Sequence, residues 1–190
     1  MITLVLFASG TGSNVEAIAQ AVQEGRLSVK LGGLVCDVPD APVITKAKDL
    51  GIHVVVVKRA DYPTNRAMDE AILSQCQAWK ADWLILAGYM RVIHAPLLEA
   101  YPRRILNIHP SLLPKYRGLD ALGQALSAGE TTLGVSVHYV DAGLDTGEVI
   151  AQIPFTIQPG TPRVEIEATL HAIEHRLYPA VIQRLVEDSK

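Results

Sequence analysis

Short apolar runs alternate along this chain with segments in which apolar residues recur at helical spacing. The apolar runs have the length of strands, and we expect strands at Ile2–Ala8, Leu31–Cys36, His53–Val57, Trp83–Ala87 and Ile105–Ile108. The periodic segments predict helices from Val15 to about Gly25, over Ala41–Leu50 and over Asn65–Trp79. Strands that are apolar on both faces and separated by helices are typical of a parallel sheet covered by helices.

The pattern changes after Ile108. Two further apolar segments, Val135–Val140 and Val149–Phe155, lie close together in the sequence with a turn at Asp145–Gly147 between them. A connection this short cannot return a parallel strand, because a parallel crossover needs a dozen or more residues. We therefore expect these two strands to pair antiparallel.

A final helix is expected to begin with Thr161 as its N-cap and Pro162 in its first turn. One face of this helix carries apolar residues at helical spacing, namely Ile166, Leu170, Ile173 and Leu177. Pro179 lacks the N–H that the helix needs, so we expect it to kink or restart the helix.

The length and composition allow one hydrophobic core. The chain has 190 residues, of which 49% are hydrophobic, and it shows no linker, low-complexity segment or internal repeat. We therefore predict an α/β fold: a Rossmann-like single domain over residues 1–190, with a mostly parallel sheet, an antiparallel C-terminal strand pair and helices on both faces.

The composition also argues against several classes of partner. A net charge of -3 and a pI near 6.1 do not provide the basic surface that nucleic-acid binding needs. Cys36 and Cys76 have neither a C-x-x-C spacing nor a histidine cluster, so we expect no metal site. The N-terminus has no basic segment typical of a signal peptide, and no apolar run is long enough to span a bilayer. We expect a soluble, cytoplasmic protein with no nucleic-acid or membrane partner.

A glycine-rich loop, Ser9–Asn14, joins the first strand to the first helix. Ser13 with Glu16 three residues later fits a capping box. The loop also fits an anion site, because backbone N–H groups at a helix start can bind a phosphate. Val15 occupies the third glycine position of the dinucleotide fingerprint, and the lysine of a P-loop is missing. Asp37, near the end of the second strand, still permits a ribose contact, so dinucleotide binding stays open.

Asn107 and His109 lie at the end of the strand Ile105–Ile108, where ligands bind in open α/β sheets. They are two residues apart, so both side chains leave the same face of an extended segment. An amide can donate a hydrogen bond to a developing oxyanion, and an imidazole can move a proton. The alternative is a buried, hydrogen-bonded pair with a purely structural role.

Four segments in order carry a resemblance to a known family: ASGTGSNVEAI (8–18), LAGYMRVI (86–93), ILNIHPSLLPKYRG (105–118) and GVSVHYVDAGLDTG (134–147). With these segments the chain resembles the folate-dependent phosphoribosylglycinamide formyltransferases of purine synthesis. The resemblance covers nearly the whole chain. It implies a catalytic group of Asn107, His109 and Asp145, although Asp145 could also serve only as a turn residue.

The resemblance implies binding residues as well. It implies that the substrate phosphate is bound by Gly12, Ser13 and Asn14, and that further substrate contacts come from Met90, Pro110 and Glu174. The pocket of the folate cofactor would be formed by Arg91, Val92, Ile93, Val140, Asp141, Ala142, Gly143 and Leu144. Arg91 could instead be a helix cap or a surface residue, and Lys115 and Arg117 could be solvated charges.

We therefore expect formyl transfer from 10-formyltetrahydrofolate to glycinamide ribonucleotide, without a metal, by a monomer or homodimer. Another user of 10-formyltetrahydrofolate remains an alternative. The enzyme acting on methionyl-tRNA and the hydrolase share the catalytic motifs, but each carries an additional domain that we do not expect in 190 residues. A non-catalytic nucleotide-binding module or a dehydrogenase fragment is the alternative from another class.

Overall fold

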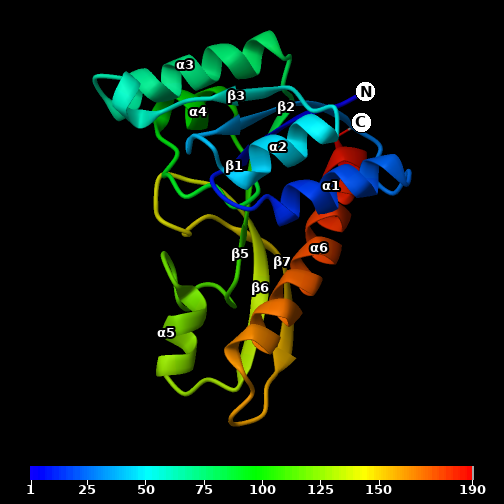
Figure 1. Ribbon diagram of the computed structural model, residues 1–190, viewed down its shortest axis with the longest axis vertical. Coiled ribbons are helices and arrows are strands. Elements are labelled where there is room, and N and C mark those ends of the chain that lie inside the picture. Colours follow the sequence, from blue (N-terminus) through cyan, green and yellow to red (C-terminus); the bar gives the residue numbers. More distant parts are fainter. Residues whose placement is uncertain (190) are drawn as a thin grey trace.

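The predicted strands form one seven-stranded sheet in the computed structural model, which describes residues 1–189 (Figure 1). The strands are β1 (Thr3–Ala8), β2 (Lys30–Cys36), β3 (Val54–Val56), β4 (Trp83–Leu86), β5 (Ile105–His109), β6 (Thr132–Tyr139) and β7 (Val149–Thr156). Their order is β3-β2-β1-β4-β5-β6-β7, and all pairs up to β4–β5 are parallel. The pairs β5–β6 and β6–β7 are antiparallel, as predicted for β6 and β7. The predicted fold class is confirmed, and Lys190 of the expected domain lies outside the described residues.

Helices cover both faces of this sheet. They are α1 (Ser13–Gln23), α2 (Pro42–Asp49), α3 (Asn65–Ala78), α4 (Ala95–Ala100), α5 (Ala121–Ser127) and α6 (Arg163–Asp188), with a 3₁₀ turn η1 (Arg59–Asp61). Residues of α1, α2, α5 and α6 pack in one core cluster, and residues of α3 and α4 pack in the other. Alternate residues of β1 enter the two clusters: Leu4 and Leu6 face the first, and Val5 and Phe7 face the second. This is why the strands are apolar on both faces.

The sheet contains a topological switch point between β1 and β4. From β1 the chain moves outward to β2 and β3, then crosses back to β4 on the other side of β1. The loops that leave β1 and β4 therefore diverge at the carboxyl edge of the sheet, where open α/β folds bind ligands. The first loop contains Gly12, and the second contains Met90.

The last helix differs from its prediction in two respects. It begins at Arg163 after Pro162, and Thr161 does not cap it, because the Thr161 hydroxyl donates to the Gln158 carbonyl at 2.8 Å instead. The helix also continues through Pro179 without restarting. The adjacent Tyr178 is fully buried, and its hydroxyl lies 3.0 Å from the carbonyl oxygens of Leu86 and Leu106. The burial of α6 side chains such as Tyr178 outweighs the hydrogen bond that proline removes.

Candidate active site

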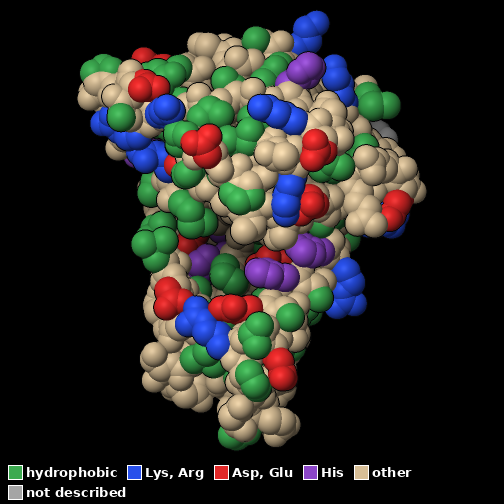
Figure 2. Space-filling view, viewed as in Figure 1, with side chains coloured by type: hydrophobic (Ala, Val, Ile, Leu, Met, Phe, Trp, Pro, Cys, Tyr) green, Lys and Arg blue, Asp and Glu red, His purple; other side chains and the backbone are tan. Residues whose placement is uncertain are grey.

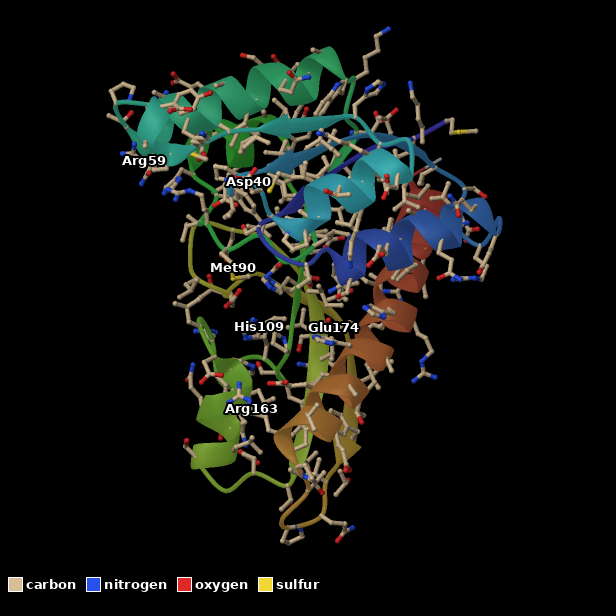
Figure 3. The ribbon with its side chains drawn as sticks, in the orientation of Figure 1. Asp40, Arg59, Met90, His109, Arg163 and Glu174 are labelled. Atoms are coloured by element: carbon tan, nitrogen blue, oxygen red, sulfur yellow. The ribbon has the colours of Figure 1, made fainter. Side chains whose placement is uncertain are left out.

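A cleft of about 700 Å³ opens where β4 and β5 end. Its walls come from the loop after β4, the loop after β6, the start of α5 and the N-terminal half of α6. Figure 2 shows a hollow across this face, with histidine side chains gathered along it. In Figure 3, His109 and Glu174 lie between Met90 on one side of the cleft and Arg163 on the other.

His109 is the last residue of β5, and its ring is oriented by the segment that follows. The side chain is buried, and Nε2 lies 2.8 Å from the Tyr116 carbonyl oxygen. A carbonyl oxygen only accepts, so Nε2 carries a hydrogen and donates it. Nδ1 is therefore the nitrogen that can gain or release a proton, and it lies 3.5 Å from Asp145 Oδ2. This arrangement suits proton transfer at Nδ1.

Asn107 is held by a residue that the sequence analysis did not identify, His138 of β6. Asn107 and His138 are register partners on the antiparallel strands β5 and β6, and Asn107 Nδ2 lies 3.2 Å from His138 Nε2. The other ring nitrogen of His138, Nδ1, lies 2.7 Å from the Tyr139 carbonyl oxygen and must donate to it. Burial lowers the pKa of His138, more than the Tyr139 bond and Asp145 raise it. The ring is therefore neutral, and Nε2 accepts from the Asn107 amide.

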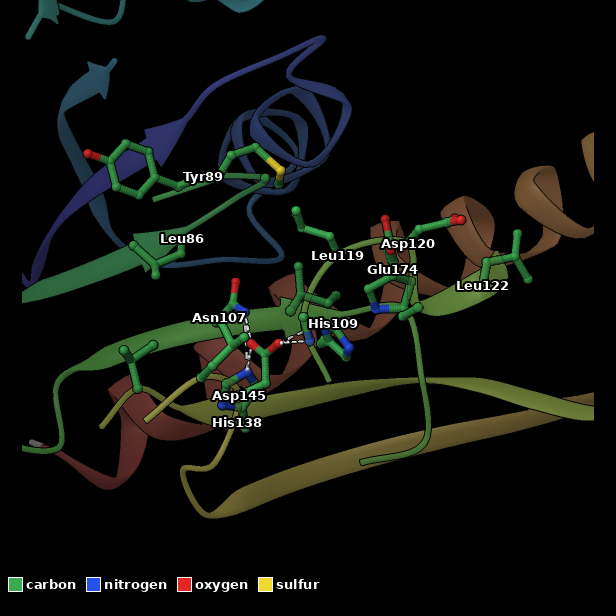
Figure 4. Close-up of a pocket in the computed structure, with 18 of the residues that line it drawn as sticks. Leu86, Tyr89, Asn107, His109, Leu119, Asp120, Leu122, His138, Asp145 and Glu174 are labelled. Carbon is green, nitrogen blue, oxygen red and sulfur yellow. Dashed lines mark hydrogen bonds and ion pairs between the residues drawn. The ribbon is translucent and has the colours of Figure 1, made fainter. Parts of the chain in front are cut away.

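Asp145 connects the other groups of the site (Figure 4). Its Oδ2 accepts from the Gly118 backbone N–H at 2.8 Å and faces His109, while Oδ1 accepts from Asn107 Nδ2 at 3.4 Å. The side chain is 11% exposed, and Asp145 has a φ of 51° in the left-handed region that Asn and Asp tolerate best among non-glycine residues. Asp145 thus joins the loop after β6 to the loop after β5, beside both predicted catalytic residues.

The start of α1 differs from the predicted capping box. The N-cap is Gly12, and no side chain caps the helix. Ser13 is the first helical residue, so its hydroxyl is not in the capping position, and Glu16 pairs with Lys46 at 2.7 Å. The first N–H groups of the helix are consequently not satisfied by a side chain, which is the arrangement that binds anions.

Gly12 has a conformation that explains its residue type. Its φ is 77°, and a Cβ at this position would overlap the side chain of Val43. Gly10 lies in the same loop, but its φ is not in this positive range, and a Cβ added there would meet no other atoms. We expect Gly12→Ala to lower the free energy of unfolding by about 1–3 kcal/mol. Gly10→Ala should change it by less than about 0.5 kcal/mol.

Chemical denaturation of the wild type and the two variants measures this difference. Equal stability of the Gly12→Ala and Gly10→Ala proteins would contradict the assignment of backbone strain to Gly12.

Asn14 and Glu174 meet across the fold, although 160 residues separate them in the sequence. Asn14 Nδ2 donates to Glu174 Oε2 at 3.0 Å, and both side chains are buried. Burial raises the pKa of Glu174, while the Asn14 hydrogen bond and then the charges of His171 and His109 lower it. Asn14 Oδ1 has no hydrogen-bond partner among residues 1–189. The pair therefore joins the glycine loop to the cleft and keeps polar capacity for a ligand.

Most of the predicted site residues line the cleft. They are Met90, Arg91, Val92, Ile93, Asn107, His109, Pro110, Val140, Asp141, Gly143, Leu144, Asp145 and Glu174. Ser13 lines a second cavity of about 300 Å³ together with Arg26 and His175. Gly12, Asn14 and Ala142 line neither cavity.

Arg91 is neither a helix cap nor paired with a carboxylate in the described part of the chain. Its Nη2 donates to Asn65 Oδ1 at 3.1 Å, and Arg59 Nε donates to the same oxygen at 2.6 Å. Lys115 forms an ion pair with Glu130 at 2.6 Å. Of the three charged residues left open by the sequence, Arg91 lines the cleft, Lys115 is paired on the surface, and Arg117 is exposed.

Among residues 1–189, no group of three or more His, Cys, Asp or Glu side chains is placed to hold a metal ion. None of the described helices is both long enough and apolar enough to cross a membrane.

The sequence and the fold are both similar to known proteins. Residues 2–182 match the family described as Formyl transferase. The phosphoribosylglycinamide formyltransferase of Bacillus subtilis (strain 168) is 43% identical over 181 residues, which cover 95% of this chain and 93% of that protein.

Two crystal structures of glycinamide ribonucleotide transformylase 1 have the same fold. The one from Geobacillus kaustophilus has a TM-score of 0.95 at 47% identity, covering 97% of this chain and 98% of its own. The one from Symbiobacterium toebii has a TM-score of 0.96 at 38% identity, and the match covers 99% of this chain and 89% of that chain. With a family match over almost its whole length and relatives this similar in sequence and in fold, the chain belongs to the formyl transferase family.

Proposed function

We propose that this protein transfers the formyl group of 10-formyltetrahydrofolate to the amino group of glycinamide ribonucleotide, giving formylglycinamide ribonucleotide and tetrahydrofolate. The observation that carries the proposal is the convergence of Asn107, His109 and Asp145 in a cleft that is also lined by Glu174, which joins it to the glycine loop through Asn14. The names of the relatives support glycinamide ribonucleotide as the acceptor over other formyl acceptors.

His109 takes the proton of the reacting amine in this mechanism. The amine nitrogen attacks the formyl carbon, the carbonyl electrons move to oxygen, and Nδ1 of His109 accepts the proton that the amine releases. The proton then passes to N10 of the folate as the carbon–N10 bond breaks and the carbonyl re-forms. Asp145 stabilises the imidazolium in between, because its carboxylate faces Nδ1. Acid–base catalysis of this kind contributes about 10²–10⁴ in rate.

Asn107 is the proposed donor to the oxyanion. Its two N–H bonds face His138 and Asp145, and in Figure 4 its amide oxygen points away from Asp145. The contact with Asp145 is the longer of the two at 3.4 Å, so it is the one that an oxyanion replaces. His138 then keeps the amide in place, and one such donor stabilises the transition state by about 3–4 kcal/mol.

The two substrates occupy different walls of the cleft in this proposal. The phosphate of the ribonucleotide binds the uncapped start of α1 at Gly12, Ser13 and Asn14. Glu174 accepts from the ribose or the glycinamide, and Met90 and Pro110 make further contacts with the ribonucleotide from the same cleft. The pterin lies between Arg91–Ile93 and Val140–Leu144, where backbone groups match its amide-like edges.

A spectrophotometric assay tests the reaction directly. Purified protein is mixed with 10-formyltetrahydrofolate and glycinamide ribonucleotide, and folate product is followed, with each substrate omitted in turn. We expect product only when both are present. Product without the ribonucleotide would support the hydrolase alternative, and binding of NAD without transfer would support the nucleotide-binding module.

At acidic pH, the KM for the ribonucleotide should depend on the protonation state of Glu174. The ionised carboxylate accepts at both oxygens, and more strongly than the protonated acid, so the KM for the ribonucleotide should rise as the pH falls through the raised pKa of Glu174. Asn14→Ala removes a hydrogen bond that lowers this pKa, so the rise should begin at higher pH.

The measurement is KM for each substrate against pH in the wild type, Asn14→Ala and Glu174→Gln. The Glu174→Gln protein should lack the acidic rise, and the KM for the folate serves as the internal control. A rise at the same pH in Asn14→Ala and wild type would rule out this assignment.

The remaining expectations belong to the same proposal. We infer that residues 1–190 act as one formyltransferase domain in the cytoplasm, as a monomer or homodimer, with small molecules as the only substrates. Size-exclusion chromatography with light scattering distinguishes the two oligomeric states.

A further inference from the structure

The cleft wall that follows β4, Gly88–Ile93, has no regular secondary structure, yet both of its ends are anchored by side chains. Between the anchors, the backbone groups of Arg91, Val92 and Ile93 make no hydrogen bonds within residues 1–189. Free donors and acceptors on a cleft wall can bind a ligand only if their positions are held. The residues that hold this wall therefore influence ligand binding without contacting the ligand.

The first anchor connects the wall to the end of β1. The Met90 N–H donates to Ser9 Oγ at 2.9 Å, and the Ser9 hydroxyl donates to Asp37 Oδ1 at 2.5 Å. The Ser9 N–H also donates to the Gly88 carbonyl at 3.0 Å. This anchor belongs to the switch point itself, between the two strands where the chain changes direction.

The second anchor is a buried carboxylate on a different element. Asp69 of α3 is 4% exposed, and its Oδ2 accepts from the His94 backbone N–H at 3.0 Å and from His94 Nδ1 at 2.9 Å. His94 is the N-cap of α4, a helix of only six residues, and Ile93 before it is buried. Such a short helix has little stability of its own. Its starting point, and with it the end of the cleft wall, depends on Asp69.

We propose that Asp69 is a positioning residue for the formyl donor, acting through His94 to hold the backbone of Arg91–Ile93 against the pterin. This inference rests on the proposed function. A carboxylate buried to this extent needs strong hydrogen bonds to offset its desolvation. Both bonds of Asp69 go to the residue at which the wall ends, and Ser9 with Asp37 holds the other end independently.

The test separates positioning from a general loss of stability. Asp69→Ala should raise the KM for 10-formyltetrahydrofolate by about tenfold, because both hydrogen bonds to His94 are lost. The KM for the ribonucleotide and kcat should stay within about twofold of wild type, because Met90 is held by the Ser9 anchor and the other residues assigned to them lie outside this wall. Asp69→Asn keeps an oxygen acceptor and should restore part of the donor affinity.

Asp82 provides a matched control. Its Oδ2 also accepts a backbone N–H, from Thr3 at 2.7 Å, but at the amino ends of β1 and β4, on the opposite edge of the sheet from the cleft. Asp82→Ala should lower the melting temperature without changing either KM. If Asp69→Ala does not fold, His94→Ala removes the ring bond alone and should raise the donor KM by about threefold.

The outcomes distinguish this inference from the proposed function. A donor-specific rise in KM that Asp82→Ala does not reproduce supports the positioning role. An unchanged donor KM, an equal rise for both substrates, or the same rise in Asp82→Ala overturns it while leaving the reaction intact. No formyl transfer by the wild type, combined with no tetrahydrofolate binding in calorimetry, overturns the proposed function itself.

Discussion

Replacing His109 by alanine is expected to lower turnover by at least about a hundredfold, the lower limit for loss of a positioned acid–base group. The reason is specific to one nitrogen. Nε2 donates to the Tyr116 carbonyl, so Nδ1 is left to exchange the proton, facing Asp145. Alanine removes that site, while the predicted phosphate and pterin contacts come from other segments. Both Michaelis constants should therefore change little.

The measurement is kcat and KM for each substrate, with the melting temperature as the control for folding. The control matters because His109 is buried and also holds the segment that contains Tyr116. A folded His109→Ala protein whose turnover stays within a few-fold of wild type would show that the residue is structural.

Asp145→Asn should have a comparable effect on turnover, again at least about a hundredfold. The substitution keeps the size of the side chain but removes the negative charge that faces His109 Nδ1. It also replaces one acceptor oxygen by a donor. The carboxylate oxygens accept from the Gly118 N–H and from Asn107 Nδ2, so one of these donors would then face an NH₂ group.

His138 helps to interpret the result. The Asp145 charge raises the pKa of His138 against the larger effect of burial, so removing the charge lowers this pKa further. His138 therefore stays neutral in the variant and continues to accept from Asn107. A loss of turnover without a change in the KM values can then be assigned to His109 and to the lost acceptor. Normal turnover with a lower melting temperature would instead mean that Asp145 only shapes its turn.

The sheet and its main helices could be predicted because they depend on local periodicity. In β1, Leu4 and Leu6 enter one core cluster and Val5 and Phe7 the other, so a short apolar run indicates a strand buried on both faces. The antiparallel pairing of β6 and β7 could be predicted from the length of their connection, because the residues between the two strands are too few for a parallel crossover. Neither inference requires knowledge of distant contacts.

The helix starts were predicted less well because they depend on backbone conformation. Ser13 and Glu16 have the spacing of a capping box, yet the chain turns at Gly12 in the left-handed region and no side chain caps the helix. The short helices α4 and α5 were not predicted. Their N-caps are His94 and Asp120, the first bonded to Asp69 on another helix and the second in a left-handed conformation.

The sequence by itself placed the end of β5 within one residue, at Ile108 where the structure has His109, and therefore put Asn107 and His109 on one face at the carboxyl edge of the sheet. Only the tertiary structure decided which groups surround them. His138 reaches Asn107 through the register of β5 and β6, Asp145 arrives on the loop after β6, and Glu174 meets Asn14 from α6. Strand formation follows from the pattern of neighbouring residues, whereas these contacts join residues far apart in the chain, so only the packing of the whole fold brings them together.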